Sequence, residues 1–272
     1  IASAWSRVPG RQAPAPDRET LERLRSLGYV GFTTPAASGG RGADPKDMIS
    51  KLSTFNRLLA GATEDLRNGR RTAAVDKLVR ALAINERAYD VHITLGDVYL
   101  ESQKYEQALG EYEAANLLNP ASADPLLGAV SVLIAQRKTD QAIRKIDDAE
   151  RLEPLSHEIP FARGRVSEQM GRKGEAFAHY ERAVALNPSD PRTRARLANM
   201  AVQLDRIDVA ATQFTALLAA GYQPARTHFG LGWVAQARGD RVTAAREYRR
   251  ALAFDPGLKV AQEALTKLEG KR

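Results

Sequence analysis

Small and large apolar residues recur along most of the chain with one fixed spacing. An alanine returns every 34 residues, with no insertion or deletion between the first and the last: Ala74, Ala108, Ala142, Ala176, Ala210 and Ala244. A period of 34 residues is typical of a stacked helix–turn–helix unit. The pattern therefore predicts six such units over residues 55–258, with this alanine at position 20 when Phe55 is position 1.

Four further positions follow the same period, and each has a physical reason. Position 8 is mostly small, so that the two helices of a unit can approach closely: Ala62, Gly96, Val130, Gly164, Ala198 and Gly232. Position 24 is large and fills the gap between neighbouring units: Leu78, Tyr112, Ile146, Tyr180, Phe214 and Tyr248. Position 27 is again small, being alanine in every unit but the fifth. Position 32 is proline in most units, which ends the second helix, but Glu86 and Tyr222 replace it in units 1 and 5. We expect these two joints to pack less regularly than the others.

Two segments show the whole pattern, VHITLGDVYLESQKYEQALGEYEAANLLNP and THFGLGWVAQARGDRVTAAREYRRALAFDP. They closely resemble the tetratricopeptide repeat family. The resemblance implies an all-α fold, a right-handed superhelical solenoid of six helix–turn–helix repeats. We place the repeats at 55–88, 89–122, 123–156, 157–190, 191–224 and 225–258. The segment GLKVAQEALTKLE then predicts a helix over 257–269, so that 259–272 forms a capping helix and tail with polar residues outward.

Residues 1–54 lack the period, and we expect a flexible N-terminal extension there. Residues 1–16 and 32–43 are rich in Gly, Ala, Pro and Ser and offer little to bury. Between them, DRETLERLRSLGYVG predicts a short helix near 18–27, capped by Asp17 and ended at Gly28. A second helix is expected to begin after Asp44 and to run into the first repeat.

The pieces LRSLGYVG and DPKDMI, separated by a Gly/Ser-rich spacer and followed by repeats, carry a second resemblance. Over residues 17–50 they look like the C-terminal part of bacterial sulfatase-like hydrolases of the alkaline phosphatase superfamily that have an appended repeat domain. This resemblance implies an upstream catalytic domain in the same polypeptide and an extracytoplasmic location, periplasmic or secreted. Without that parentage we expect a cytoplasmic protein, and the alternative for 17–50 is a generic capping helix and linker.

Composition narrows the function classes. The chain has no cysteine, which excludes disulfides, thiolate metal sites and cysteine nucleophiles. It has no run of eighteen apolar residues, so we expect no transmembrane segment. The net charge is +7, but acidic residues of the second repeat interrupt any basic stripe, so nucleic acid is not an expected partner: Asp90, Asp97, Glu101, Glu106, Glu111 and Glu113.

The chemistry of an enzyme is missing. The string nearest to a sulfatase nucleophile turn is SDPRTR, where Thr193 stands in place of the required arginine and the Ser-Asp-Pro run is ordinary for a helix start. The histidines are scattered over the repeats: His92, His157, His179 and His228. We therefore expect no catalytic residues, no metal site and no cofactor.

What remains is a surface. In the resembled family, first-helix positions 2, 5, 9, 12 and 13 line a concave groove, and here they bring aromatic and cationic residues together in repeats 4 to 6, around the small Ala195. Such a mixture is common in binding hot spots. The implied peptide-binding residues are Phe161, Arg165, Arg192, Asn199, Arg226, Phe229 and Trp233. The alternative is that the phenylalanines only pack between helices and the arginines lie at a solvated rim.

The sequence thus favours a non-catalytic protein–protein interaction scaffold. Its ligand would be an extended peptide or a helix in the groove, with an acidic group beside an apolar anchor. The leading alternative is a module that positions a sulfatase-like hydrolase on its partner or substrate. A third reading is a self-associating scaffold, which follows if the capping helix is incomplete.

Overall fold

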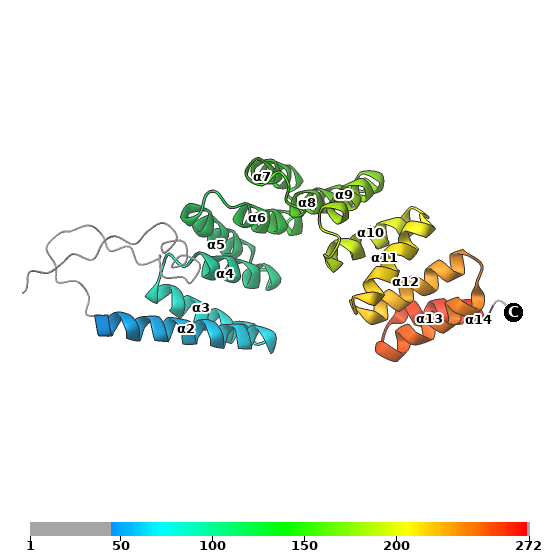
Figure 1. Cartoon of the computed structure of the whole chain (residues 1–272), viewed down its shortest axis with the longest axis horizontal. Coiled ribbons are helices and arrows are strands. Elements are labelled where there is room, and N and C mark those ends of the chain that lie inside the picture. Colours follow the sequence, from blue (N-terminus) through cyan, green and yellow to red (C-terminus); the bar gives the residue numbers. More distant parts are fainter. Residues whose placement is uncertain (1–44, 271–272) are drawn as a thin grey trace, which may run out of the picture. The chain divides into compact units, whose positions relative to one another are not determined.

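The computed structural model describes residues 45–270, and all regular structure within them is helical. The short helix expected near 18–27 and the segments 1–16 and 32–43 lie outside the described residues. Thirteen helices lie within the described part of the chain (Figure 1): α2 Pro45–Arg67, α3 Arg71–Ile84, α4 Tyr89–Glu101, α5 Tyr105–Leu118, α6 Asp124–Ala135, α7 Thr139–Leu152, α8 Glu158–Gln169, α9 Lys173–Leu186, α10 Pro191–Gln203, α11 Ile207–Ala219, α12 Pro224–Ala237, α13 Arg241–Phe254 and α14 Lys259–Glu269.

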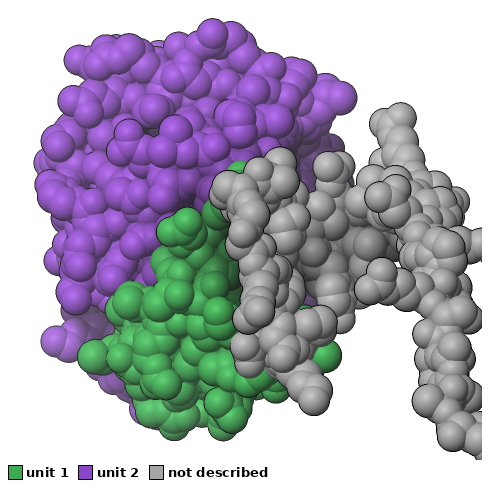
Figure 2. All heavy atoms as spheres, turned by 90° about the vertical axis from the view of Figure 1, so that its left-hand side faces the viewer, with its two compact units in different colours: residues 1–91 green, residues 92–272 purple. Residues whose placement is uncertain are grey.

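The helices follow one another as hairpin pairs, from α2 with α3 to α12 with α13, and α14 packs on α13 (Figure 1). The chain divides into two compact units, residues 1–91 and 92–272 (Figure 2). The first unit contains α2 and α3, and the second contains α5 to α14. No helix among residues 45–270 is long and apolar enough to span a membrane.

The periodic small residues are the contact points of each pair. All six alanines at position 20 have no exposed surface. At position 8, a Cβ added to Gly96, Gly164 or Gly232 would lie within 2.6 Å of the tyrosine ring at position 24 of the same repeat. Because Cβ atoms essentially never approach so closely, glycine is required wherever a tyrosine fills this space. The close approach predicted from the sequence is therefore confirmed.

The buried tyrosines also tie the second helix of a repeat to the first through their hydroxyl groups. Tyr112 donates a hydrogen bond to Asp97 Oδ1 at 2.7 Å, and Tyr180 donates one to Glu168 Oε2 at 2.7 Å. Burial, reinforced by the neighbouring carboxylates, raises the pKa of both tyrosines well above the usual value near 10. The rings thus stay protonated donors, and the polar edge of each buried ring is satisfied.

One backbone feature recurs in every repeat although the residue type at its position varies. Position 15, in the turn between the two helices of each repeat, always has a positive φ: Gly69, Gln103, Arg137, Gly171, Asp205 and Gly239, with φ between 53° and 81°. The next amide closes the turn, as where Arg172 N donates to Ser167 O at 2.9 Å. Every repeat therefore uses the same left-handed turn, with or without glycine.

The two ends of the repeat array refine the predicted boundaries. Helix α2 begins at Pro45 and runs without a break to Arg67, so the second predicted helix does continue into repeat 1. Residues 45–54 of the segment 1–54 are therefore helical, as the predicted second helix requires, and no glycine or further proline interrupts them. At the other end, α14 starts at Lys259, two residues later than expected, and buries Ala261 completely.

Candidate functional site

A cavity of about 420 Å³ opens between the first helices of repeats 5 and 6 and the start of α14. Helices α10 and α12 form its sides, α11 contributes to its floor, and residues around the beginning of α14 close one end. Its lining is largely apolar and aromatic: Ala195, Asn199, Val202, Phe214, Leu217, Tyr222, Gln223, Arg226, Thr227, Phe229, Gly230, Trp233, Leu258 and Val260.

The joint between repeats 5 and 6 shapes one wall of this cavity. It is the only joint between repeats, among the described residues, that contains positive φ angles, at Gly221 and Gln223. Thr227 Oγ1 donates a hydrogen bond to the carbonyl oxygen of Tyr222 at 2.7 Å and fixes the path of the chain. Since Tyr222 replaces the proline of position 32, the irregular joint supplies an aromatic ring to the cavity.

The glycine at position 230, which has no side chain, shapes the floor of the cavity. A Cβ at Gly230 would lie 2.4 Å from the ring of Phe214, so the ring rests directly on the backbone of α12. Phe214 itself is buried at the joint of α11 and α12. The cavity thus has a rigid aromatic floor, held in place by tight packing.

The structure brings together four of the seven residues predicted from the groove positions: Asn199, Arg226, Phe229 and Trp233. Ala195, the small residue expected at the centre of the recess, lines the same cavity. Phe229 and Trp233 are only half-buried, and the Phe229 ring lies 5.7 Å from the ring of Tyr248. These two rings therefore have a packed side and a side open to a ligand.

The other three predicted residues lie outside the cavity and have partners of their own. Phe161 packs on Tyr180, with ring centroids 5.9 Å apart, and the Arg192 guanidinium lies 5.8 Å from its ring centre. Arg192 also pairs with Glu158 at 2.7 Å. Arg165 donates to Ser131 Oγ at 3.0 Å, and burial lowers its pKa from the usual value.

The charge of the cavity edge comes from one residue. Arg226 is exposed and has no hydrogen bond or ion pair within residues 45–270. The neighbouring Asn199 is exposed as well and makes no side-chain hydrogen bond with the described residues. An uncompensated guanidinium beside half-exposed aromatic rings can bind an acidic group next to an apolar one.

Comparison with known proteins identifies the repeats. The family model described as "Tetratricopeptide repeat" matches residues 59–123, 127–191 and 196–259. The chain belongs to the tetratricopeptide repeat family. Membership implies a protein-interaction scaffold on a fold that is generally non-catalytic.

Three similar proteins illustrate how widely this repeat array occurs. The human protein O-mannosyl-transferase TMTC1 is 24% identical over 205 residues, which cover 74% of this chain and 23% of TMTC1, so the chain spans less than a quarter of that relative. The solved structure of PilF from Pseudomonas aeruginosa has a TM-score of 0.62 at 21% identity and covers 82% of this chain and 100% of PilF. YrrB, described as a TPR protein with an unusual peptide-binding site, has a TM-score of 0.50 at 21% identity, covering 69% of this chain and 96% of YrrB.

Several cavity residues of this tetratricopeptide repeat protein were missed by sequence reasoning. Leu258 and Val260 reach the cavity from the start of α14, for which the sequence predicts only a capping role. Tyr222 was noted as a missing proline, and its aromatic character was the signal that could have assigned it to the site. The site therefore includes the irregular joint and the capping helix, besides the groove positions.

Two of the histidines, His92 and His228, and the SDPRTR segment have structural partners. His92 lies 2.7 Å from Glu111 and His228 lies 2.8 Å from Glu247, each pair joining position 4 to position 23 of its own repeat. Within residues 45–270, no group of three or more His, Cys, Asp or Glu is placed to hold a metal ion. Asp190 of the SDPRTR segment caps α10, accepting hydrogen bonds from the amides of Arg192 and Thr193.

Proposed function

We propose that this protein binds a peptide segment of a partner on the first-helix face of repeats 5 and 6. The observation that carries the proposal is the cavity of about 420 Å³ with Phe229, Trp233 and Tyr222 in its walls. Its volume suits one large apolar side chain with the adjoining backbone. Aromatic rings that are rigid and half-exposed give a large contact area at a small entropic cost.

The ligand carries an acidic group beside its apolar anchor. Arg226 supplies the only unpaired positive charge that we find on the cavity lining, whereas the charge of Arg192 is compensated by Glu158 and Asp190. A carboxylate in the ligand can form a charge-assisted hydrogen bond with the Arg226 guanidinium without first breaking another ion pair. YrrB, which shares the fold, is described as having a peptide-binding site, and we propose the same general use of the repeats here.

An array of synthetic peptides tests this proposal. Each peptide has a central Leu, Phe or Trp flanked by Glu, Gln or Lys, and binding to wild type is compared with binding to Trp233→Ala, Arg226→Glu and the control Leu155→Ala. We expect Trp233→Ala to cost at least about 2 kcal/mol, as for a central interface aromatic. Arg226→Glu should reverse the preference for Glu flanks. Leu155 is exposed and lies outside the cavity, so its replacement should change nothing.

The assignment fails if the peptides that bind wild type bind both cavity variants equally well. Binding of the same array to Arg192→Glu and Phe161→Ala then tests the adjoining surface of repeats 4 and 5, where these two side chains lie together. Thermal melts of all variants establish that a loss of binding does not reflect unfolding.

A second candidate function is a positioning module of a larger sulfatase-like hydrolase. It is favoured by the order of LRSLGYVG, DPKDMI and the repeats in the sequence. By its name TMTC1 is a transferase, and the chain matches less than a quarter of it. The test is the coding sequence upstream of Ile1: a nucleophile turn with Asp and His metal ligands supports the module, and an unrelated sequence overturns it.

A further inference from the structure

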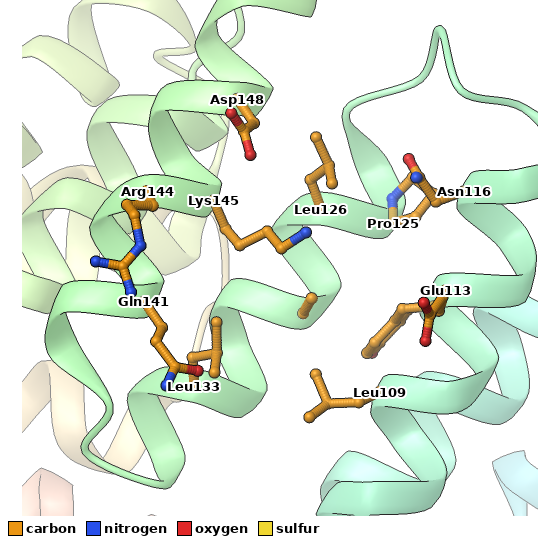
Figure 3. Close-up of a pocket in the computed structure, with 12 residues that line it drawn as sticks. Leu109, Glu113, Asn116, Pro125, Leu126, Leu133, Gln141, Arg144, Lys145 and Asp148 are labelled. Atoms are coloured by element: carbon orange, nitrogen blue, oxygen red, sulfur yellow. The ribbon is translucent and has the colours of Figure 1, made fainter.

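A second cavity, of about 570 Å³, lies on the second-helix face of repeats 2 and 3 (Figure 3). It shares no residue with the cavity at repeats 5 and 6. Helix α6 forms its floor, and α5 and α7 form its two walls: Leu109, Tyr112, Glu113 and Asn116 from α5; Pro125, Leu126, Ala129 and Leu133 from α6; Gln141, Arg144, Lys145 and Asp148 from α7.

A small residue at position 7 of the third repeat, Ala129, lies in the floor of the cavity. This position is leucine in repeats 2, 5 and 6 (Leu95, Leu197 and Leu231), but Ala129 in repeat 3. Repeat 1 has Gly61 there, and the side chain of Lys77 covers it, 3.2 Å from the place of a Cβ. Repeat 4 has Arg163 there, which pairs with Asp147 at 2.8 Å and with Glu150 at 2.6 Å. The equivalent cavity beside Arg163 measures only about 150 Å³. Alanine at this position therefore leaves open a space that the larger Arg163 fills in repeat 4.

The geometry of the walls matches a helix. Helix α5 contributes residues at i, i+3, i+4 and i+7, and α7 contributes residues with the same spacing. These stripes run along one face of each helix for about two turns. A third helix that carries large apolar residues at the same spacing can pack its ridge between the two walls and above Ala129.

The charges of the walls define the flanks of such a helix. Arg144 and Lys145 on α7 are exposed and have no acidic partner within residues 45–270. Lys145 extends from α7 across the cavity toward α5 (Figure 3). Glu113 and Asn116 stand on the opposite wall, and Glu113 has no basic partner among the described residues. Asp148, also on the α7 wall, is paired with Arg151, which lies outside the cavity lining. The two walls therefore differ in unpaired charge, one basic and one acidic to neutral.

We propose that this cavity is a docking site for an amphipathic helix of a partner protein. The helix places an apolar side chain over Ala129, an acidic flank against Arg144 and Lys145, and a basic or amide flank against Glu113. The opposite charges of the two walls fix the direction in which the helix lies, because turning it end to end exchanges its flanks.

A displayed library of helical peptides of about 18 residues, or five turns, tests the proposal. The peptides have leucine at i, i+3, i+4 and i+7, and their flanking positions are drawn from Glu, Gln and Lys. We expect selection on wild type to enrich peptides with Glu on one flank and Lys or Gln on the other. Dissociation constants of the enriched peptides are then measured on the variants.

Two variants act on different features of the site. Ala129→Leu restores the residue of repeats 2, 5 and 6, fills the cavity, and should weaken binding at least about tenfold. Lys145→Glu should weaken mixed-flank peptides by about three- to tenfold and strengthen peptides with Lys on both flanks. Lys145 is exposed, so this variant tests the site even if Ala129→Leu alters folding.

Matched controls separate this site from others. Leu117→Ala changes a leucine of α5 that is 78% exposed and lies outside the cavity, and Trp233→Ala removes the aromatic ring of the other cavity. Neither should alter the affinity. The proposal is overturned if no peptide is enriched, if the enriched peptides bind Ala129→Leu and Lys145→Glu as they bind wild type, or if they depend on Trp233.

Discussion

Position 15 of each repeat holds the backbone in the left-handed region, where a Cβ is strained. Arg137 has φ of 58° in the turn between α6 and α7, and its amide donates to Ile134 O at 3.0 Å. A residue other than glycine costs roughly 1–2 kcal/mol in this conformation. Glycine removes that strain, but the larger conformational entropy of the unfolded chain lowers the stability by roughly 0.5–1 kcal/mol.

We predict that Arg137→Gly stabilises the protein by about 0.5–1 kcal/mol. Arg137→Ala keeps the Cβ and should leave the stability nearly unchanged, so it is the matched control. Urea unfolding of both variants measures the difference. Equal midpoints for Gly and Ala would show that the turn is not strained at this residue.

Single residues also show what sequence reasoning captured. The alanines of position 20 and the tyrosines of position 24 were predicted as contact points because burial demands one residue size in every repeat, and the structure confirms them. Position 15 escaped notice, since a backbone angle does not demand one residue type and Gly171, Arg137 and Asp205 all adopt it. Ala129 escaped notice for a related reason: position 7 holds glycine, leucine, alanine or arginine in different repeats, so its size follows no period.

At the scale of helices, residues that occupy the same numbered position in successive repeats can be neighbours in space. Arg192 pairs with Glu158, and Arg165 bonds Ser131, each across 34 residues. Sequence reasoning placed both arginines on the correct helices but did not predict their partners, which lie 34 residues earlier in the chain. The same rule explains why Arg226 has no ion pair with the described residues. The residues 34 positions before and after it are Arg192 and Val260, and neither is acidic. Its free charge could thus have been predicted from spacing alone.

The start of α10 leads to a prediction about pH. Asp190 accepts hydrogen bonds from Thr193 Oγ1 at 2.5 Å and from Arg192 N at 3.0 Å. Burial raises its pKa, but these hydrogen bonds and the Arg192 charge outweigh burial and lower the pKa below the usual value. Because the folded-state pKa is lowered, the stabilisation is present above the unfolded pKa of about 3.9 and is lost as the pH falls through the folded value.

We predict that Asp190→Ala costs about 1–2 kcal/mol at pH 7, as expected for the loss of a helix cap. The difference in the free energy of unfolding between this variant and wild type should become smaller as the pH falls below about 4, because wild type then loses the same interactions. Asp190→Asn keeps an acceptor without a titrating group, so it should be nearly as stable as wild type at pH 7 and show a weaker pH dependence. The free energy of unfolding of all three proteins is measured between pH 7 and pH 3. A difference between wild type and Asp190→Ala that stays constant over this range contradicts the prediction.

At the scale of the whole molecule, each repeat buries its apolar face only against its neighbours, so the last repeat needs a cover. Helix α14 provides one: Ala261 is completely buried, and Leu265 and Leu268 pack against the cluster that contains Ala244 and Tyr248. The same helix brings Val260 to the cavity of repeats 5 and 6. Covering the end of the array and completing the proposed peptide site are therefore linked in one short helix.

We predict that removing residues 259–272 uncovers the apolar face of α12 and α13 and makes the protein associate in a concentration-dependent way. Hydrogen exchange should rise in α12 and α13 but stay unchanged in α8 and α9, since a solenoid transmits the loss only to adjacent repeats. Light scattering after size-exclusion chromatography measures the association. Lys267→Ala, an exposed change on α14 that keeps the helix, is the control. A truncated chain that stays monomeric and melts like wild type would show that α14 does not act as the cap, and the apolar contacts of Leu265 and Leu268 would then contribute little to stability.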